Sequence, residues 1–596
     1  MTTAAEDIDP AMRGVWNGSS SAGGQRDEGG DRDDGLKRAR RWAWAGLTVV
    51  LAGGLALRLW GVRQGLPYAY NADEADHFVP HAIAMFGHNL NPGYFANPPA
   101  YTYVLHYLFA IAYGGTTGAR KAIAMHPADV YTLARVAAAV LGTLALWLLY
   151  ATGARLFGRA VGLLAAAIEA VAFLPVFYAH LALNDVPTLA PLTLSLLGSA
   201  GVLRKGRARD HLLAGLGLGL ACATKYTAGI VLVPYLAAVA ASYLQSAPQL
   251  GSARAGRRAV GGIVLAGALA LTGFLLANPY ALLDYTDFLT ELVHQSTLSA
   301  EAQGKLGAPR DGGLAYYLWT LTWGLGWVPA LAALGGSVSV WWRERALGWT
   351  LVPAPLLYLA FMGLQGRYFG RWLLPIFPIL CLLAALFAVQ LVDALARRRP
   401  RLRFAAAALL VAALLAQGFV YSVHAGRTLA RADTRNLTRA WMLAHIPAGA
   451  PIVVEPVAPD QWGTRWNKYP SLISRVSKTG ALQASAGARI GIEGYERTLA
   501  PALIDYYRAH GYCWVLSGST ESGRAFADPH AVPLAIAYYR ALERQGEVVY
   551  RASPYASGKG PVAFGFDWSF DYYPLAYERP GPYMTIYRLH GGRCGH

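Results

Sequence analysis

The sequence predicts a polytopic α-helical membrane protein with about eleven transmembrane helices, followed by a C-terminal extracytoplasmic α/β domain. First, 55% of the 596 residues are hydrophobic and only 15% are charged, and the mean hydropathy is +0.30, a balance that ordinary soluble domains do not have. Second, the chain contains apolar runs close to the roughly 20 residues that a helix needs to cross a bilayer. The runs are residues 42–61, 129–152, 161–178, 186–203, 211–224, 227–245, 259–277, 315–335, 347–364, 372–391 and 404–422.

The basic residues predict the topology of these runs. The formal net charge is +17, which in a soluble protein would suggest nucleic acid as a partner. Here the lysines and arginines form clusters on alternate connections between apolar runs. The clusters lie at residues 37–41, 155–159, 204–209, 254–258, 343–345 and 397–403. This positive-inside pattern predicts a protein integral to the cell (plasma or inner) membrane, with a cytoplasmic N-terminus, an exported C-terminus and no nucleic acid partner.

Composition divides the chain into three parts. Residues 1–41 begin with a Gly-, Ser- and Asp-rich stretch, and we expect a disordered cytoplasmic tail. Residues 42–422 form the predicted transmembrane domain, with residues 62–128 as its first extracytoplasmic loop. Residues 423–596 alternate strand-like and helix-like runs, which predicts a small α/β domain. The strand-like runs are Ile452–Glu455, Tyr512–Leu516, Glu547–Arg551 and Tyr583–Leu589, and the helix-like runs are Leu499–His510 and Ala531–Gln545.

The four cysteines show no spacing typical of a zinc site. Cys222 and Cys381 lie inside apolar runs, whereas Cys513 and Cys594 lie in the C-terminal region. If that region is exported, Cys513 and Cys594 can form a disulfide, because oxidising compartments permit one. The sequence alone leaves open whether they pair.

The first extracytoplasmic loop is dense in acidic residues and histidines. Asp73 and Glu74 are adjacent, and His77 and His81 follow closely. A solvated loop is the simplest interpretation, but charged groups that collect beside a membrane also suggest a functional site. The topology places further charged side chains on the same outer side. They are Asp185, Lys225, Arg367 and Arg371.

Carboxylates combined with fixed cations suit the transfer of a group from an anionic, lipid-linked donor. A carboxylate can accept the proton of an acceptor hydroxyl as general base. Cations can stabilise the negative charge that develops on a departing phosphate. The outer side of this chain offers both kinds of group.

The motifs of this loop also resemble those of a known family. Asp73-Glu74 is followed by His77-Phe78 and later by Asn97-Pro98-Pro99. This order resembles the first extracytoplasmic loop of the protein O-mannosyltransferases and is similar to the lipid A aminoarabinose transferases. Both belong to the family 39-like members of the GT-C superfamily of polyprenyl-phosphate-sugar-dependent glycosyltransferases. Further matching motifs are Asn184–Pro187, Thr224–Tyr226, Asn278–Tyr280, and Arg367-Tyr368 with Arg371.

The resemblance implies a GT-C membrane glycosyltransferase that moves a sugar, with inversion, from a polyprenyl-phosphate donor to an acceptor hydroxyl on the extracytoplasmic side. The acceptor would be a protein, a lipid or a glycan, membrane lipids would surround the enzyme, and no cofactor or metal would be obligatory. Asp73 would be the general base. Of the other two catalytic residues, Glu74 would shape the protonation of Asp73 or bind the acceptor, and Asp185 would be a second acidic residue at the same pocket. The donor phosphate would be bound by Lys225, Arg367 and Arg371. The substrate pocket would contain His77, Asn97, Tyr101, Tyr226 and Tyr368.

This chain departs from the family at Asn97. A basic residue or a histidine often stands at that place before the Pro-Pro pair and helps to hold the donor phosphate. The phosphate contacts therefore have to come from the other cations, and the departure leaves the donor geometry and the sugar open.

Several candidates also have a purely structural interpretation. Asp185 precedes Pro187 and is suited to capping a helix. Lys225 can extend from a helix end to the surface, and Arg367 and Arg371 can anchor a span at the interface.

Two further groups have open roles. His77 and His81 are four residues apart, the spacing of two metal ligands on one helix, with Asp73 or Asp76 as a third. A hydrogen-bonded interfacial histidine is the alternative. Glu169 lies within the third predicted span, where a charged group must face the protein interior or be neutral. We assign it no catalytic role.

The main alternative function is a polytopic secondary transporter with a charged outer vestibule. Transporters usually show internal repeats and sites near the midplane of the membrane. We find no repeat here, and the charged groups collect at one outer edge. A membrane-anchored receptor, a third possibility, leaves the acidic first loop unexplained.

Overall fold

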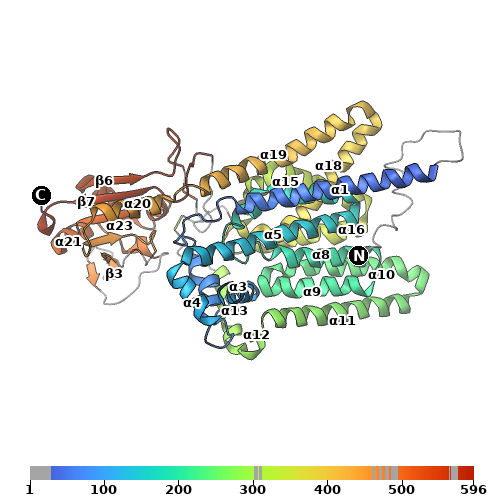
Figure 1. Cartoon of the computed structure of the whole chain (residues 1–596), viewed down its shortest axis with the longest axis horizontal. Coiled ribbons are helices and arrows are strands. Elements are labelled where there is room, and N and C mark those ends of the chain that lie inside the picture. Colours follow the sequence, from blue (N-terminus) through green and yellow to red (C-terminus); the bar gives the residue numbers. More distant parts are fainter. Residues whose placement is uncertain are drawn as a thin grey trace.

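The computed structural model describes residues 28–300, 306–307, 312–459, 462, 465–468, 473–476, 482–484, 494–562, 564–565 and 575–595. Long helices lie side by side in a bundle, and a small domain with a sheet lies at one end of it (Figure 1). The predicted fold class is confirmed. Within the described ranges, eight helices are long and apolar enough to cross a membrane, and the C-terminal region forms a separate sheet.

The bundle follows the apolar runs of the sequence. Its helices are α1 (Glu28–Leu59), α5 (Pro127–Phe157), α6 (Arg159–Val171), α7 (Phe173–Tyr178), α8 (Leu189–Arg204), α9 (Ala208–Thr224), α10 (Leu232–Leu250), α11 (Ser252–Ala277), α14 (Gly313–Leu321), α15 (Trp327–Arg343), α16 (Arg345–Leu351), α17 (Pro353–Gly363), α18 (Phe377–Arg398) and α19 (Arg403–Leu429). Short π- or 3-10-helical segments adjoin them at η3 (Tyr226–Val231), η4 (Thr322–Gly326), η5 (Gly370–Ile376) and η6 (Pro400–Leu402).

Two connections contain helices of their own. The connection between α1 and α5 contains η2 (Glu74–Phe78), α2 (Val79–Ala84), α3 (Ala100–Tyr113) and α4 (Thr116–Met125). The connection after α11 contains α12 (Tyr280–Leu283) and α13 (Tyr285–Ala300).

Three of the predicted runs form helices shorter than a full bilayer span. Residues 161–178 form α6 and α7, most of residues 186–203 form α8, and residues 211–224 lie within α9. Helix α8 packs between α5, α9 and α10, and most of its side chains are buried. A short helix is tolerated at this position because its ends contact protein rather than lipid.

The prediction of a disordered tail over residues 1–41 needs a correction. Helix α1 begins at Glu28 and continues without a break into the first apolar run. Lysine and arginine are good helix formers, so the basic cluster at residues 37–41 does not end the helix. Residues 1–27 lie outside the described residues.

The third span is broken between α6 and α7, and two neighbouring helices satisfy the carbonyls that the break exposes. Arg58 of α1 donates to the carbonyls of Ala170 at 3.1 Å and Glu169 at 3.3 Å. Ser422 of α19 donates to the carbonyl of Val171 at 2.9 Å. A cation at a helix C-terminus also complements the helix dipole. Glu169 is fully buried here, close to Arg58.

The C-terminal domain confirms the predicted alternation of strands and helices. Its five-stranded sheet has the order β2 (Asn467–Lys468), β1 (Pro451–Val454), β5 (Trp514–Gly518), β7 (Met584–Leu589) and β6 (Gly546–Ala552). Strand β1 is parallel to β2 and β5, whereas β7 is antiparallel to β5 and β6. A separate pair is formed by β3 (Ile473–Val476) and β4 (Leu482–Ala484).

Helices cover both faces of this sheet. Alternate side chains of β1 point to opposite faces, as strand geometry requires. Val453 belongs to a core with α21 (Ala502–His510) and α23 (Pro533–Gln545). Ile452 and Val454 belong to a second core with α20 (Thr434–His445). The remaining elements are α22 (Ser519–Ala527), η8 (Tyr495–Thr498) and η9 (Gly592–Cys594).

Cys513 and Cys594 form a disulfide, with Cα atoms 5.3 Å apart. The bond joins the residue before β5 to the end of the chain and closes a loop of 81 residues. The two remaining cysteines, Cys222 and Cys381, are free thiols. The pairing that the sequence left open is therefore present.

We expect Cys513→Ser to lower the free energy of unfolding of the C-terminal domain by about 2–4 kcal/mol, because the open chain gains conformational entropy when unfolded. Chemical denaturation followed by tryptophan fluorescence measures this loss, and Cys222→Ser is the matched control. Four titratable thiols in the denatured, unreduced wild-type chain would contradict the assignment.

Candidate active site

Four charged residues from distant parts of the chain form one cluster at the end of the bundle next to the sheet domain. Lys225 is paired with Asp185, and Arg371 bridges the two acids. The Arg371 guanidinium lies 2.5 Å from Oδ2 of Asp73 and 3.9 Å from Oδ2 of Asp185. The cluster therefore holds two carboxylates and two cations, which balance in charge before any substrate binds.

Each member of the cluster lies where a helix begins or is interrupted. Asp73 immediately precedes the π-helix η2. Lys225 lies in extended conformation between α9 and η3. Arg371 belongs to the 3-10 segment η5 at the start of α18. Such interruptions free the backbone from the regular helical path, and π-helical segments are frequent at functional sites.

The cluster has a buried side and an open side. Asp185, Arg371 and Lys225 are only 4%, 7% and 9% exposed. The side chains of Asp73 and His77 are 28% and 31% exposed. A ligand can therefore reach Asp73 and His77 first, with the two cations behind them.

The pKa of Asp73 lies below its ordinary value of 3.8. Burial raises the pKa of this carboxyl group, but its interactions with Arg371, His77 and Lys225 together lower it by more. Asp73 is therefore ionised at neutral pH, as a general base must be.

A stack of three rings forms one wall beside Asp73. Tyr94 lies between His77, with ring centroids 4.6 Å apart, and His81, with centroids 5.0 Å apart. Asn97 donates to the Tyr94 hydroxyl at 2.8 Å. Nε2 of His77 lies 3.8 Å from Oδ1 of Asp73. Tyr94 is a member of this wall that we did not predict, since a lone tyrosine in a loop carries no specific signal.

The histidine spacing has a structural explanation. Nδ1 of His81 contacts the carbonyl of Pro92 at 2.7 Å, and burial lowers the pKa of His81. The neutral imidazole thus donates to the loop backbone. Among the residues that the structure describes, no group of three or more His, Cys, Asp or Glu side chains is placed to hold a metal ion.

Glu74, predicted as a catalytic acid, does not face this cluster and needs a correction. It is fully buried, and both carboxylate oxygens lie 2.7 Å from the guanidinium of Arg135 on α5. The backbone N–H of Ala182 donates to it at 2.8 Å. Adjacent residues on a helical path point in different directions, so Asp73 faces the site while Glu74 anchors the loop.

We expect Glu74→Gln to act mainly on folding. The substitution leaves the Arg135 charge buried without its carboxylate, which costs about 3–5 kcal/mol. The measurement is the thermal midpoint of the purified protein in detergent, with Asp76→Asn on the same π-helix as control. A variant as stable as wild type but inactive would instead support a catalytic Glu74.

Three predicted pocket tyrosines lie in different surroundings. Tyr101 is 1% exposed and donates to the carbonyl of Ala134 at 2.8 Å, so it is a core residue and not a wall of the pocket. Tyr226 donates to the carbonyl of Phe95, near Asn97. Tyr368 is buried against the ring of Tyr316.

The sequence also suggested purely structural roles for Asp185, Lys225, Arg367 and Arg371, and the structure tests them one by one. Helix α8 begins at Leu189 without a side-chain cap, so Asp185 does not cap it. Lys225 is buried against Asp185 and does not extend to the surface. Arg371 lies in the cluster, and the backbone N–H of Arg367 donates to the carbonyl of Ser299 at 3.2 Å.

Glu291 of α13 is a second residue that sequence analysis missed. Its carboxylate accepts from the backbone N–H groups of Phe95 and Ala96. It thereby fixes the segment that carries Asn97 and Tyr94. The contact joins residues far apart in sequence, and no local sequence pattern predicts it.

The fold and the cluster define a polytopic membrane protein with a charged site at one end of its helical bundle. Residues 128–276, which extend from α5 to α11, match the family model described as dolichyl-phosphate-mannose-protein mannosyltransferase. Over these residues, about a quarter of the chain, the protein is similar to that family, in agreement with the resemblance that the sequence motifs indicated. No curated protein sequence matches the chain.

Three solved structures are similar at low identity. The oligosaccharyltransferase AglB from Archaeoglobus fulgidus, solved with an inhibitory peptide and a dolichol-phosphate, has 13% identity and a TM-score of 0.49, with 87% of this chain and 74% of that one covered. ArnT from Cupriavidus metallidurans, bound to undecaprenyl phosphate, has 14% identity and a TM-score of 0.48, with 92% and 98% covered. The mycobacterial arabinofuranosyltransferase AftD has 16% identity and a TM-score of 0.38, with 94% and 42% covered.

Proposed function

We propose that this protein transfers a sugar from a polyprenyl-phosphate donor to an acceptor hydroxyl on the extracytoplasmic side of the membrane. The observation that supports this most is the bridge of Arg371 between Asp73 and Asp185. It places a partly exposed carboxylate directly beside buried cations, which are the two components that such a transfer needs.

In this proposal the acceptor hydroxyl attacks the anomeric carbon from the side opposite the phosphate, with inversion. Asp73 takes the hydroxyl proton as the new carbon–oxygen bond forms. The bond between the anomeric carbon and the phosphate oxygen breaks, and polyprenyl phosphate leaves with one more negative charge. Arg371 and Lys225 stabilise that charge.

The arrangement also suggests how donor binding prepares the base. Lys225 already neutralises Asp185, so Arg371 is the cation whose partner, Asp73, lies on the open side. When the donor phosphate attracts Arg371, Asp73 loses the charge that lowers its pKa. The pKa of Asp73 then rises, and the carboxylate becomes a stronger base at the moment when an acceptor is needed.

We also propose the orientation in the membrane. Residues 1–41 are cytoplasmic, residues 42–422 form the catalytic membrane domain, and residues 423–596 form an exported domain. The basic connection between α18 and α19 lies at the end of the bundle remote from the sheet domain (Figure 1). The Cys513–Cys594 disulfide supports an oxidising, extracytoplasmic compartment for the sheet domain.

The acceptor is a protein, a lipid or a glycan, and the reaction as proposed requires no obligatory cofactor. Two side-chain cations already provide the positive charge for the phosphate, so we expect turnover to persist in the presence of a chelator. Loss of activity on chelation, restored by a divalent cation, would contradict this part of the proposal.

The decisive experiment is to purify the full-length protein from its native membrane and analyse co-purifying lipids by mass spectrometry. We expect a polyprenyl phosphate that carries one sugar. The same lipid, radiolabelled in the sugar, should then act as donor in proteoliposomes. Ion-driven uptake of a solute without bound lipid phosphate would favour the transporter alternative, which has no internal repeat to support it.

A further inference from the structure

The loop that carries Asp73 is held by the C-terminal domain as well as by the membrane bundle. We propose that Asp433, Arg435 and Asn436 at the start of α20, here called the α20 clamp, are positioning residues for Asp73. This inference rests on the proposed role of Asp73 as catalytic base. It assigns the exported domain a part in the transfer reaction itself.

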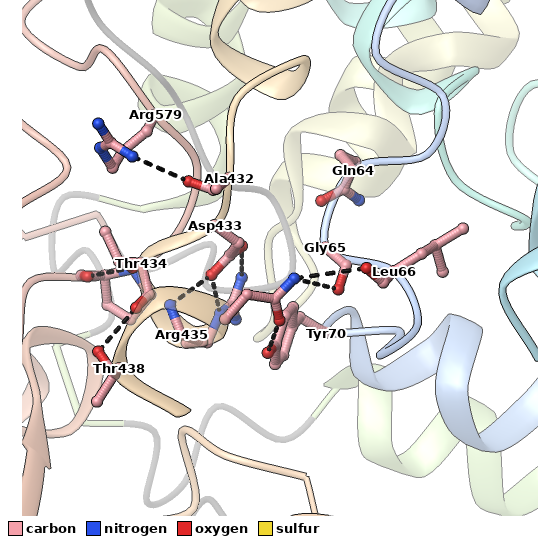
Figure 2. A network of polar contacts seen from close by, with 12 residues as sticks. Gln64, Gly65, Leu66, Tyr70, Ala432, Asp433, Thr434, Arg435, Thr438 and Arg579 are labelled. Atoms are coloured by element: carbon pink, nitrogen blue, oxygen red, sulfur yellow. Dashed lines mark hydrogen bonds and ion pairs between the residues drawn. The ribbon is translucent and has the colours of Figure 1, made fainter. Parts of the chain in front are cut away.

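The α20 clamp contacts residues 65–70, the segment that precedes Asp73. Asn436 accepts a hydrogen bond from the Tyr70 hydroxyl at 2.6 Å and donates to the carbonyls of Gly65 at 3.0 Å and Leu66 at 3.5 Å. The guanidinium of Arg435 lies 3.7 Å from the centroid of the Tyr70 ring. One asparagine and one arginine of α20 thus hold both ends of residues 65–70. Figure 2 shows Asp433, Arg435, Tyr70, Gly65 and Leu66 in this network.

The clamp is itself rigidly held. The fully buried Asp433 caps α20 by accepting from the backbone N–H of Arg435 at 2.8 Å, and it accepts from the Arg435 guanidinium at 2.9 and 2.8 Å. This contact fixes the guanidinium over Tyr70. Removal of any of these groups would free a side chain that now has one orientation.

Helix α20 is in turn hydrogen-bonded to the segment that precedes strand β7 of the sheet domain. The backbone N–H of Thr434 donates to the carbonyl of Pro580 at 3.0 Å, and its hydroxyl donates to the carbonyl of Pro582 at 2.7 Å. Gly581 between them has a φ of +99°, and a Cβ there would lie 2.2 Å from the Thr434 hydroxyl. The clamp therefore moves with the sheet domain.

The other side of the loop is held by the bundle. Arg135 of α5 donates to the carbonyls of Val62 and Gln64 and also holds Glu74. Asn71, which follows Tyr70, accepts from the backbone N–H groups of Glu74 and Ala75. Asp73 thus lies on a short segment fixed by the bundle and by the exported domain, and a shift at Tyr70 is transmitted to it.

The test compares Asn436→Ala, Tyr70→Phe and the double variant in full-length protein in lipid nanodiscs. Thr438→Ala is the matched control, because Thr438 is buried on the same helix and its hydroxyl donates within α20, to the carbonyl of Thr434. We expect Asn436→Ala to lower kcat for sugar transfer by about 10–100-fold with little change in KM for the donor, as a misplaced base predicts. Tyr70→Phe should lose less, and the double variant should match Asn436→Ala, because both changes remove one shared hydrogen bond.

Hydrogen exchange of residues 65–78 gives a readout that does not depend on activity. We expect exchange there to accelerate about tenfold in Asn436→Ala and not in Thr438→Ala. Unchanged exchange and kcat, or equal losses in the control, would overturn the proposal. If the wild-type protein transfers no sugar, the proposed function fails, while the exchange data still decide whether the clamp holds the loop.

Discussion

Asp73→Asn is expected to abolish sugar transfer, with kcat lowered by about 10³–10⁴-fold, because the amide cannot accept the proton of the acceptor hydroxyl. Donor binding should be retained or strengthened. The neutral side chain releases Arg371, which lies 2.5 Å from Asp73 in the wild-type protein, for the donor phosphate. Single-turnover transfer and equilibrium binding of the radiolabelled donor lipid measure the two effects separately.

Asp76→Asn is the matched control for this experiment. Asp76 lies on the same π-helix but is exposed to solvent, so its variant should retain most of the activity. Because the pKa of Asp73 is lowered, the carboxylate is ionised at every pH above its ordinary value. At limiting donor, kcat/KM of the wild-type protein reports the free enzyme and should therefore show no loss from Asp73 until the pH falls below about 4. Full activity of Asp73→Asn would exclude Asp73 as the base.

The arrangement of Asp73, Asp185, Lys225 and Arg371 could be predicted in outline because membrane topology is a strong constraint. Apolar runs and basic connections assign each loop to one side of the bilayer, and charged residues on one side can converge. The structure brings these four residues together. The α/β character of the C-terminal domain was predictable for a similar reason, since strands and helices have different periods.

The orientation of individual side chains could not be predicted in this way. Asp73 and Glu74 are neighbours in sequence, yet one reaches the site and the other pairs with Arg135 in the core. The π-helix that follows Asp73 sets these directions, and no sequence pattern predicts one. Tyr101 was assigned to the pocket from the family resemblance, whereas its hydroxyl donates to the carbonyl of Ala134 within the core.

Contacts between the two domains were beyond sequence analysis altogether. Tyr70 and Asn436 are 366 residues apart. Neither belongs to a sequence motif that indicates a contact. Their meeting depends on how the C-terminal domain docks on the bundle. Residues that position a catalytic group through such contacts are visible only once the chain has been folded.

Arg371→Ala should produce the second large effect, a loss of affinity for the donor rather than for the acceptor. Truncation of a buried, hydrogen-bonded cation costs about 2–5 kcal/mol, so we expect donor affinity to fall by at least about 30-fold with little change in acceptor affinity. Arg371→Lys should restore only part of this loss, because a single ammonium cannot contact Asp73 and Asp185 in the manner of the planar guanidinium. Titration of donor lipid into nanodiscs measures both variants.

The pH dependence of the same variants separates phosphate binding from a merely structural role of Arg371. Arg371 lowers the pKa of Asp73, so its removal raises that pKa, and Asp73 takes up a proton at a higher pH than in wild type. The acid limb of the transfer rate should therefore move to higher pH in Arg371→Ala and less in Arg371→Lys. An acid limb that stays in place, or equal losses of donor and acceptor affinity, would mean that Arg371 does not couple the donor phosphate to the base.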